Sequence, residues 1–371
     1  MTRIKFTEDF KEQPAVIRVV GLGGAGGNAV NRMIEAEVAN VEFIAANTDA
    51  QALRRSLAPV RIQIGERLTK GLGVGGNPSI GGQAALESED RIREICQGAD
   101  MLFLTAGMGG GTGTGSAPIV AKIARQLNPA PLVIAVVTRP FAFEGLVRAN
   151  QASAGIEELR PYVDTLLVIP NDRLFEIIDE KTPSLEAFRV ADDVLRQAMQ
   201  AIADVITTHG LVNVDFADVR TIMSGAGEAL MGIGSGSGQD RAISAARQAV
   251  QSPLLENVSI EGAKGVLVNI TGNKNITMFE VREVMDFVSS ATATTSHVFY
   301  GQVFDESLED KLKVTVIATG FPARSFGKDR PVSAKKAPGI PVMVAPSAPK
   351  AMSDDDLRRP AYLRLKNRKL K

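Results

Sequence analysis

The stretch "TAGMGGGTGTGS", residues 105–116, decides the fold of the first half of this chain. It holds six glycines and three threonines, and it lies between the apolar run "DMLFL" (residues 100–104) and "APIVAKIARQL" (residues 117–127). The apolar residues of the second run recur at helical spacing, so the glycines connect a predicted strand to a predicted helix. Glycine tracts also serve as tight turns or flexible linkers. At the start of a helix, however, bare backbone N–H groups favour a phosphate site. We call residues 105–116 the second glycine loop.

A first glycine loop, "GLGGAGG" at residues 21–27, has the same setting. It connects a predicted strand at residues 15–20 to a helix predicted from about Ala29, and it matches the dinucleotide pattern G-x-G-x-x-G. That pattern also requires an acid at the end of the second strand, where this chain has Asn47. Two glycine loops on one sheet therefore favour the clamping of one polyphosphate, and an NAD(P)-dependent oxidoreductase is the alternative. A third glycine-rich segment, residues 68–82, is either a plain loop or a cover over the phosphates.

The composition is that of a globular protein with room for about two domains. The chain has 371 residues, of which 44% are hydrophobic, and its net charge of zero gives no support to nucleic-acid binding. No stretch resembles a signal peptide or a membrane span, so we expect a cytoplasmic protein. Cys96 is the single cysteine, which excludes an internal disulfide. His209 and His297 are the only histidines, which argues against a His-based metal site.

Strands and helices alternate up to about residue 179, which is typical of a parallel sheet covered on both faces. One long predicted helix follows, and then less regular strands around a helix whose Thr277 and Glu280 have capping-box spacing. We predict an α/β fold in which a Rossmann-like domain is joined by the long helix to a smaller α+β domain. The predicted segments are an N-terminal extension (1–12), the Rossmann-like domain (13–181), the central helix (182–209), the α+β domain (210–320), a disordered linker (321–352) and a tail (353–371).

Three polar side chains follow the long helix within "NVDFADVR", residues 213–220. Asn213, Asp215 and Asp218 can cap the next helix, because Asp and Asn favour N-cap positions. Three acceptors within six residues can equally orient a water molecule beside a phosphate. Both interpretations remain open on this pattern alone.

Several motifs together resemble the tubulin/FtsZ superfamily. "GGGTGTG" (residues 109–115) is similar to its signature, and "NVDFADVR" is similar to the water-positioning loop of the FtsZ family of bacterial cell-division GTPases. "GLGGAGGNAVNRM", "NTDAQAL", "TKGLGVGGNP", "FAFEGLVR" and "IPNDRL" occur in the family's order. The resemblance covers residues 13–320 and returns at "RPAYLR" near the C-terminus. It implies a GTPase with a Rossmann-like nucleotide domain.

The resemblance also implies which residues hold GTP or GDP. Glu144 and Arg148 match contacts to the ribose and phosphates, and Asn171 and Asp193 match contacts to guanine. Mg²⁺ would be bound through the nucleotide phosphates, with no metal ligands from the protein. The phosphate-binding positions are Gly23, Gly24, Ala25, Gly26 and Gly27 in the first glycine loop, Gly109, Gly110, Gly111, Thr112, Gly113 and Thr114 in the second, and Asn47 after the second strand.

In the family, the active site is completed between subunits, so Asn213, Asp215 and Asp218 of one molecule would act on the nucleotide of the next. The resemblance thus implies a head-to-tail polymer that forms a ring at midcell beneath the membrane. A noncatalytic tubulin-like scaffold is a further alternative, and the presence of both aspartates argues against it. Such an assembly needs neither nucleic acid nor a membrane span.

The tail departs from the family motif Asp-Ile-Pro-Ala-Phe-Leu-Arg, because this chain reads "DLRRPAYLR" and then continues with a basic end. Pro360, Tyr362 and Leu363 still offer a short apolar anchor. The resemblance implies that this anchor binds membrane-tethering and regulatory division proteins.

Overall fold

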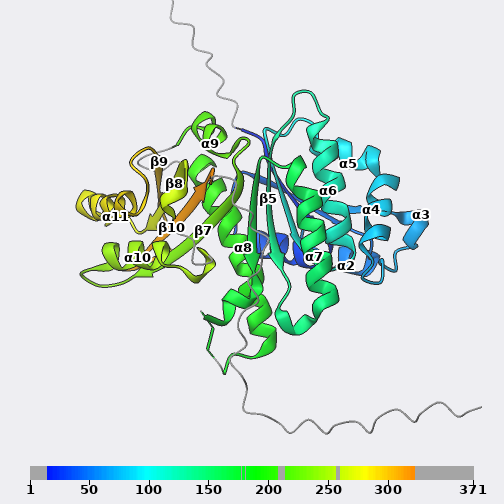
Figure 1. Cartoon of the computed structure of the whole chain (residues 1–371), viewed down its shortest axis with the longest axis horizontal. Helices are drawn as coiled ribbons and strands as arrows, with labels where there is room; N and C mark the ends of the chain where they lie inside the picture. Colours follow the sequence, from blue (N-terminus) through cyan, green and yellow to red (C-terminus); the bar gives the residue numbers. More distant parts are fainter. Residues whose placement is uncertain (1–14, 177, 180, 208–213, 256–259, 322–371) are drawn as a thin grey trace, which may run out of the picture. The chain divides into compact units, whose positions relative to one another are not determined.

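A computed structural model describes residues 15–321, apart from residues 177, 180, 208–213 and 256–259 (Figure 1). The predicted N-terminal extension and the tail with Pro360, Tyr362 and Leu363 lie outside the described residues, as does the linker beyond Phe321. Asn213 also lies outside them.

The first half of the chain forms six parallel strands. Their spatial order is β3-β2-β1-β4-β5-β6, with every neighbouring pair parallel. This is the order of a Rossmann fold, in which ligands bind outside the carboxyl ends of the strands where the order reverses. Here that point lies between β1 and β4, the strands that precede the two glycine loops. The strands are β1 (Ile17–Leu22), β2 (Val41–Asn47), β3 (Val60–Gln63), β4 (Met101–Gly107), β5 (Leu132–Arg139) and β6 (Thr165–Pro170).

Helices cover both faces of these strands, because successive side chains of a buried strand point to opposite faces. Val19 of β1 belongs to one hydrophobic core with α1 and α8, and Val20 belongs to the other with α4, α5, α6 and α7. Within the described part of the chain, none of the helices is both long and apolar enough to span a bilayer. The helices of this half are α1 (Gly23–Glu35), α2 (Ala50–Arg54), α3 (Glu66–Thr69), α4 (Pro78–Glu87), α5 (Glu89–Cys96), α6 (Thr112–Arg125) and α7 (Leu146–Leu159).

The second half continues the same sheet. The order runs on as β6-β7-β10-β8-β9, giving ten strands in the described part of the chain. Strand β7 is parallel to β6, and β10 is antiparallel to both its neighbours. A separate core lies between these strands and α10 and α11. The elements are α9 (Phe216–Met223), β7 (Gly227–Gly236), α10 (Arg241–Val250), β8 (Gly265–Gly272), α11 (Met278–Ala291), β9 (His297–Phe304) and β10 (Leu312–Thr319). The predicted α/β and α+β halves are thus confirmed as architecture, while the domain boundaries stay predictions.

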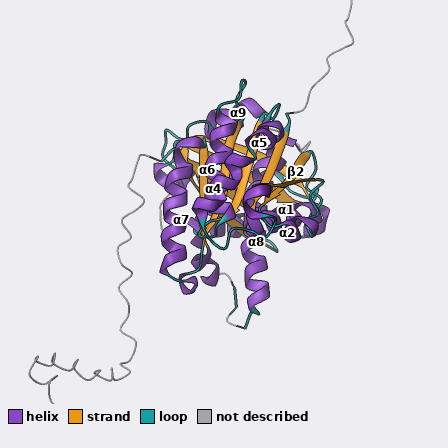
Figure 2. Cartoon of the chain, turned by 90° about the vertical axis from the view of Figure 1, so that its right-hand side faces the viewer, coloured by secondary structure: helices purple, strands orange, loops and turns teal. Residues whose placement is uncertain are grey.

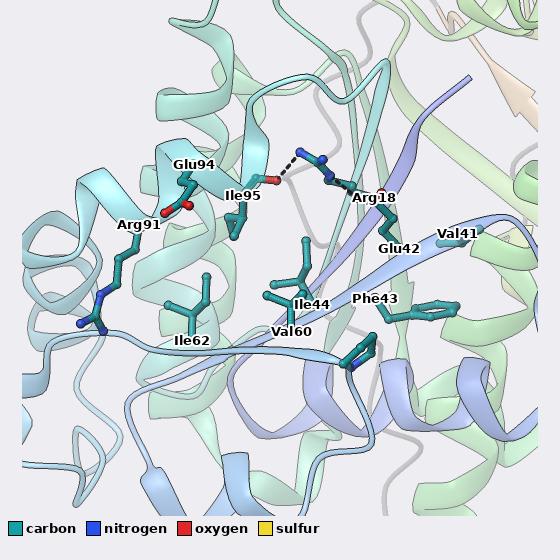
Figure 3. A pocket seen from close by; sticks show the side chains of 11 residues that line it. Arg18, Val41, Glu42, Phe43, Ile44, Val60, Ile62, Arg91, Glu94 and Ile95 are labelled. Atoms are coloured by element: carbon teal, nitrogen blue, oxygen red, sulfur yellow. Dashed lines mark hydrogen bonds and ion pairs between the residues drawn. The ribbon is translucent and has the colours of Figure 1, made fainter. Parts of the chain in front are cut away.

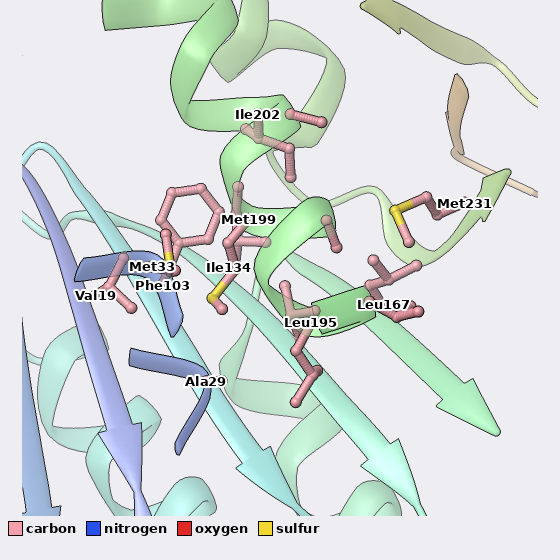
Figure 4. Close-up of a cluster of buried hydrophobic side chains, with 14 of the residues drawn as sticks. Val19, Ala29, Met33, Phe103, Ile134, Leu167, Leu195, Met199, Ile202 and Met231 are labelled. Atoms are coloured by element: carbon pink, nitrogen blue, oxygen red, sulfur yellow. The ribbon is translucent and has the colours of Figure 1, made fainter. Parts of the chain in front are cut away.

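The long helix α8 (Ser184–Thr207) packs against both halves of the sheet. Figure 4 shows its Leu195, Met199 and Ile202 beside Leu167 of β6 and Met231 of β7. These side chains are buried, so α8 fixes one half on the other. Two views place α9 at one end of α8 and the first turns of α8 at the opposite end of the molecule (Figure 1 and Figure 2).

Some elements differ from the sequence prediction, and glycine is the reason. Helices α1 and α6 begin inside the glycine loops, at Gly23 and Thr112, earlier than the predicted starts. Strand β7 was not predicted at all, because its glycines are unfavourable in a strand. A Cβ on Gly232 would lie 1.9 Å from the Ala249 carbonyl oxygen of α10. The missing side chains therefore let α10 pack directly on β7. By contrast, the predicted capping box is confirmed, since the Glu280 N–H donates to Thr277 Oγ1 at 3.3 Å.

Candidate functional site

A cavity of about 300 Å³ lies at the carboxyl ends of the parallel strands, at the reversal of strand order between β1 and β4. This volume is at the lower end of the range for small-molecule sites. It is lined by Leu22, Gly24, Ala25, Gly107, Met108, Gly109, Gly110, Gly111, Thr112, Gly113, Thr138, Pro140, Glu144, Arg148, Asn171, Phe188, Ala191, Asp192 and Leu195. The two glycine loops, the start of α7, the end of β6 and the first half of α8 therefore meet here.

The two glycine loops touch each other. Gly23 has a φ of +72°, and a Cβ there would lie 3.0 Å from the Gly113 nitrogen. The second loop is also braced from within, because the Gly109 N–H donates to Thr114 Oγ1 at 2.8 Å. Thr114 is buried and does not line the cavity. Its contribution is to the shape of the loop.

The glycines of the loops fall into two kinds. A Cβ on Gly26 would lie 2.3 Å from the Thr105 carbonyl oxygen, so this glycine lets α1 pack on β4. At Gly24 and Gly110, by contrast, a Cβ would have no protein atom within 4 Å, and both glycines line the cavity. The space in front of Gly24 and Gly110 is therefore available to a ligand, which can approach the bare backbone.

The third glycine-rich segment packs behind the second loop. A Cβ on Gly111 would lie 2.3 Å from Cγ2 of Val74 and 2.9 Å from the nitrogen of Asn77. None of residues 68–82 lines the cavity. Of the two interpretations of this segment, the structure favours a supporting loop over a cover.

Glu144 and Arg148 form an ion pair at the mouth of the cavity. Glu144 is held by the Phe141 N–H, which donates to its carboxylate at 3.0 Å. The Arg148 side chain is 57% exposed and lines the cavity. The pair places a guanidinium and a carboxylate within reach of any anionic or hydroxyl-bearing ligand.

The side-chain oxygen of Asn171 is a buried hydrogen-bond acceptor that receives no hydrogen bond from the described residues. Its Oδ1 atom is inaccessible to solvent and has no hydrogen-bond partner within the described part of the chain. An unsatisfied buried acceptor costs about 1–3 kcal/mol. Asn171 lines the cavity, so a ligand that carries a hydrogen-bond donor would recover this free energy.

The cavity is reached by Asp192, not by the predicted Asp193. Phe188, Ala191, Asp192 and Leu195 line it together, at the i, i+3, i+4 and i+7 spacing of one helix face. Asp193 lies next to that face, and its carboxylate accepts a hydrogen bond from Arg196 Nε at 2.6 Å. The structure therefore does not bring the predicted guanine contact at Asp193 to the cavity. Asp192 lies four residues after Phe188, on the helix face that lines the cavity.

Burial raises the pKa of the Asp192 carboxyl to about 6, with the positive charge of Arg32 acting in the opposite direction. Near neutral pH this group is therefore a largely ionised, partly desolvated carboxylate. Such a group is a strong hydrogen-bond acceptor.

Asn47 is buried at the end of β2 and does not line the cavity. Its Oδ1 atom accepts the Asp49 N–H at 3.1 Å, and Asp49 in turn caps α2. Asn47 thus shapes the turn after β2. The predicted residues that do not line the cavity are Gly23, Gly26, Gly27, Asn47, Thr114 and Asp193.

Asp215 and Asp218 lie away from the cavity, at the start of α9. Between Leu195 at the cavity and Thr207 at its end, α8 rises by about 18 Å, and α9 follows beyond that end (Figure 1). Asp215 occupies the N-cap position without a side-chain cap hydrogen bond. Neither carboxylate has an ion-pair partner among the described residues. The capping interpretation therefore loses support, since the side chain of Asp215 caps none of the described N–H groups of α9.

Among the described residues, no group of three or more Asp, Glu, His or Cys side chains could hold a metal ion. Cys96 is buried, and burial raises the pKa of its thiol to about 12. It is therefore unsuited to act as a nucleophile or a metal ligand.

Comparison with known proteins gives the same assignment along most of the chain. A family model described as "Tubulin/FtsZ family, GTPase domain" matches residues 16–179, and one described as "FtsZ family, C-terminal domain" matches residues 227–322. The solved structure of an empty FtsZ dimer from M. jannaschii is 45% identical, with a TM-score of 0.80, over 84% of this chain and 89% of that one. The chain belongs to the FtsZ family.

A second FtsZ structure from M. jannaschii, that of a tryptophan-to-tyrosine mutant, is 46% identical with a TM-score of 0.80, over 83% of this chain and 92% of that one. CetZ2 from Haloferax volcanii, solved as a GTPgS-bound protofilament, is 20% identical with a TM-score of 0.70, over 84% of this chain and 94% of that one. At that identity CetZ2 supports the fold alone.

Membership of the FtsZ family decides between the two enzyme classes that the glycine loops left open. The first half of the chain is a GTPase domain of the tubulin/FtsZ type, and the oxidoreductase alternative is not supported. Nucleotide binding and GTPase activity follow at the level of the family. The open space before Gly24 and Gly110 and the unsatisfied Asn171 acceptor fit a nucleotide.

Proposed function

We propose that this FtsZ-family chain binds GTP in the cavity and hydrolyses it to GDP and phosphate only when a second subunit docks on that face. The observation that carries the proposal is the separation of the two sets of groups. The cavity has groups for binding, yet Asp215 and Asp218 lie beyond the far end of α8. A neighbouring subunit would bring its own Asp215 and Asp218 to the nucleotide.

The residues of the cavity divide between the parts of the nucleotide. Backbone N–H groups of the two glycine loops would bind the phosphates, and Glu144 and Arg148 the ribose and phosphates. Guanine presents its N1–H and exocyclic amine as donors, which suit the acceptors of Asn171 and Asp192. We therefore assign the guanine contact to Asp192 in place of Asp193. Mg²⁺ would be held through the phosphates and would neutralise their charge.

Hydrolysis of a phosphate anhydride depends mainly on positioning and electrostatics. In our proposal Asp215 and Asp218 accept hydrogen bonds from a water molecule and direct its lone pair at the γ-phosphorus. The oxygen that bridges the β- and γ-phosphates leaves with GDP. Asn213 would contribute a further polar contact to this loop.

A contact between the cavity face of one subunit and the α9 face of the next is heterologous, so it propagates as an open filament. The FtsZ relative from M. jannaschii was solved as a dimer, which supports self-association of this kind. We further propose that the filaments form the division ring at midcell in the cytoplasm. Residues 353–371 would bind an adaptor there through Pro360, Tyr362 and Leu363.

The proposal is tested by measuring GTP turnover per subunit against protein concentration. We expect turnover per subunit to rise steeply above a threshold, because each active site needs two subunits. Turnover per subunit that stays constant from dilute to concentrated protein contradicts completion in trans. Nucleotide binding with no turnover at any concentration would support the noncatalytic scaffold instead.

Nucleotide affinity should fall at acidic pH through Asp192. Its pKa in the free protein is about 6, and the ionised carboxylate is a stronger acceptor for guanine than the neutral acid, so affinity should drop by up to about tenfold between pH 7 and pH 5. Because this pKa lies above the ordinary value, the same group makes the free protein more stable as pH falls through 6. Isothermal titration at several pH values measures the affinity. Asp192→Asn is the control, because the nucleotide phosphates are protonated in the same way with parent and variant. If nucleotide affinity changes equally with pH in both proteins, the assignment of the guanine contact to Asp192 is contradicted.

A further inference from the structure

A second hollow, larger than the nucleotide cavity, lies on another part of the parallel sheet. This groove has a volume of about 720 Å³ and opens between the sheet and α5 (Figure 3). Its lining residues are Arg18 of β1, residues 41–44 of β2, Pro59, Val60 and Ile62 beside and in β3, and Arg91, Glu94 and Ile95 of α5. None of them belongs to the site proposed for GTP.

One side of the groove is an unpaired strand edge. Among the described residues, β3 pairs with β2 only from Ile44 to Asn47, whereas residues 41–43 pair with β1 alone. Three consecutive residues of β2 therefore leave their outer edge open toward the groove. An open strand edge is a template for another extended segment.

The floor of the groove is apolar. Figure 3 shows the side chains of Ile44, Val60, Ile62 and Ile95 gathered between the sheet and α5. Val60 is 43% exposed, although it lies in a strand beside a hydrophobic core. At one end the groove is closed by Arg18, which donates to the Ile95 carbonyl at 3.0 Å. An occupant with alternating apolar side chains would fit this floor and the open edge together.

The chain itself supplies such a segment next to the groove. The described residues begin at Ala15, and Ile17 is paired with Val41 of β2. Residues 3–7, "RIKFT", alternate so that Ile4 and Phe6 share one face of an extended segment. Residues 8–16 separate them from β1 and can span about 30 Å. The position beside β2 lies two strand spacings from β1, about 10 Å, so the connection is long enough.

We propose that residues 3–7 of the same chain lie in this groove along the open edge of β2, with Ile4 and Phe6 on the apolar floor. The segment runs antiparallel to β2. The chain can then reverse its direction and enter β1, which is parallel to β2. Alternation places Arg3 and Lys5 on the opposite face of the segment from the apolar floor. A tethered segment has a high effective concentration at the groove, which favours it over a second copy of the chain.

The test compares amide hydrogen exchange in the full chain and two matched variants, without nucleotide. Phe6→Asp and Thr7→Asp add the same charge at neighbouring positions on opposite faces. We expect Phe6→Asp to speed exchange of the peptides covering residues 41–43 and 59–62 about tenfold, and Thr7→Asp to change it less than about twofold. Exchange in Ile17–Leu22 of β1 should remain as in the parent, which separates local release from unfolding.

Equal exchange in the parent and both variants overturns the proposal, and so does equal acceleration by both. Protection that appears only at high protein concentration assigns the groove to a second copy and also overturns it. A disulfide gives an independent measurement, because Cys96 is buried and does not compete. Phe6→Cys with Val60→Cys should cross-link within one chain, and Thr7→Cys with Val60→Cys should not. Neither readout involves GTP, so failure here leaves the proposed function intact.

Discussion

Replacing Asp218 with alanine should lower GTP turnover at least about 100-fold, the loss expected when a group that orients or deprotonates the attacking water is removed. GTP affinity of the isolated subunit should stay within about twofold of the parent, since Asp218 lies far from the cavity. Asp215→Ala should likewise lower GTP turnover and leave GTP affinity nearly unchanged. Asp215 makes no cap hydrogen bond, so its loss should cost α9 little stability. Turnover under saturating GTP and equilibrium binding of a labelled nucleotide measure the two effects.

Mixing two inactive variants separates completion in trans from action within one chain. Gly110→Val directs a side chain into the cavity without meeting the protein, so it should block the nucleotide alone. In an equal mixture of Asp218→Ala and Gly110→Val, about one contact in four joins an intact cavity to an intact loop. Turnover should therefore recover to as much as about a quarter of the parent value. A mixture as inactive as its components would contradict our proposal.

GTP should compete for the cavity at least about tenfold better than ATP, because adenine would leave buried acceptors unpaired at about 1–3 kcal/mol each. Adenine presents a lone pair at N1, which faces the Asp192 carboxylate unfavourably. Asp192→Ala should remove most of this preference, chiefly by weakening GTP. Competition of each nucleotide against a labelled guanine nucleotide measures it.

Asp193→Ala is the matched control for the guanine contact. Its carboxylate is engaged with Arg196 and does not line the cavity, so the variant should keep the preference for GTP. If Asp193→Ala loses the preference for GTP and Asp192→Ala keeps it, Asp193 contacts guanine as the family resemblance implies, and our assignment of Asp192 is wrong. Thermal unfolding of both variants controls for loss of the Arg196 ion pair.

Most of the parallel half could be predicted from the sequence because its strands are continuous apolar runs. The strand predicted at residues 15–20 overlaps the observed β1, Ile17–Leu22. Strand β7 could not be predicted from the sequence. Its glycines are needed because α10 packs closely on Gly232, and that contact is visible only in the structure. The helix starts at Gly23 and Thr112 were missed for a related reason. Glycine has a low intrinsic helix propensity, and contacts between the two loops override it.

The site was predicted less completely than the fold. The loops, Glu144, Arg148 and Asn171 could be found from motifs, and the structure brings them to one cavity. The motif points to Asp193 as a guanine contact, whereas the adjacent Asp192 lines the cavity, so both assignments stay predictions. The direction of a side chain on α8 depends on which face packs against the sheet, and that becomes visible only through neighbours such as Phe188 and Leu195. The groove beside β2 has no motif at all.

The narrow junction between the two halves of the sheet has a mechanical consequence. Strands β6 and β7 share three residue pairs, from Thr165 with Gly227 to Leu167 with Ala229, whereas β7 and β10 share eight. In a head-to-tail filament, tension entering at the cavity face leaves at the α9 face, so it crosses this junction and the length of α8. In such a filament the sheet would resist tension least at this junction, and the buried side chains of α8 would carry the remaining load between the halves. The elasticity of the filament would arise inside its subunits as well as at the contacts between them.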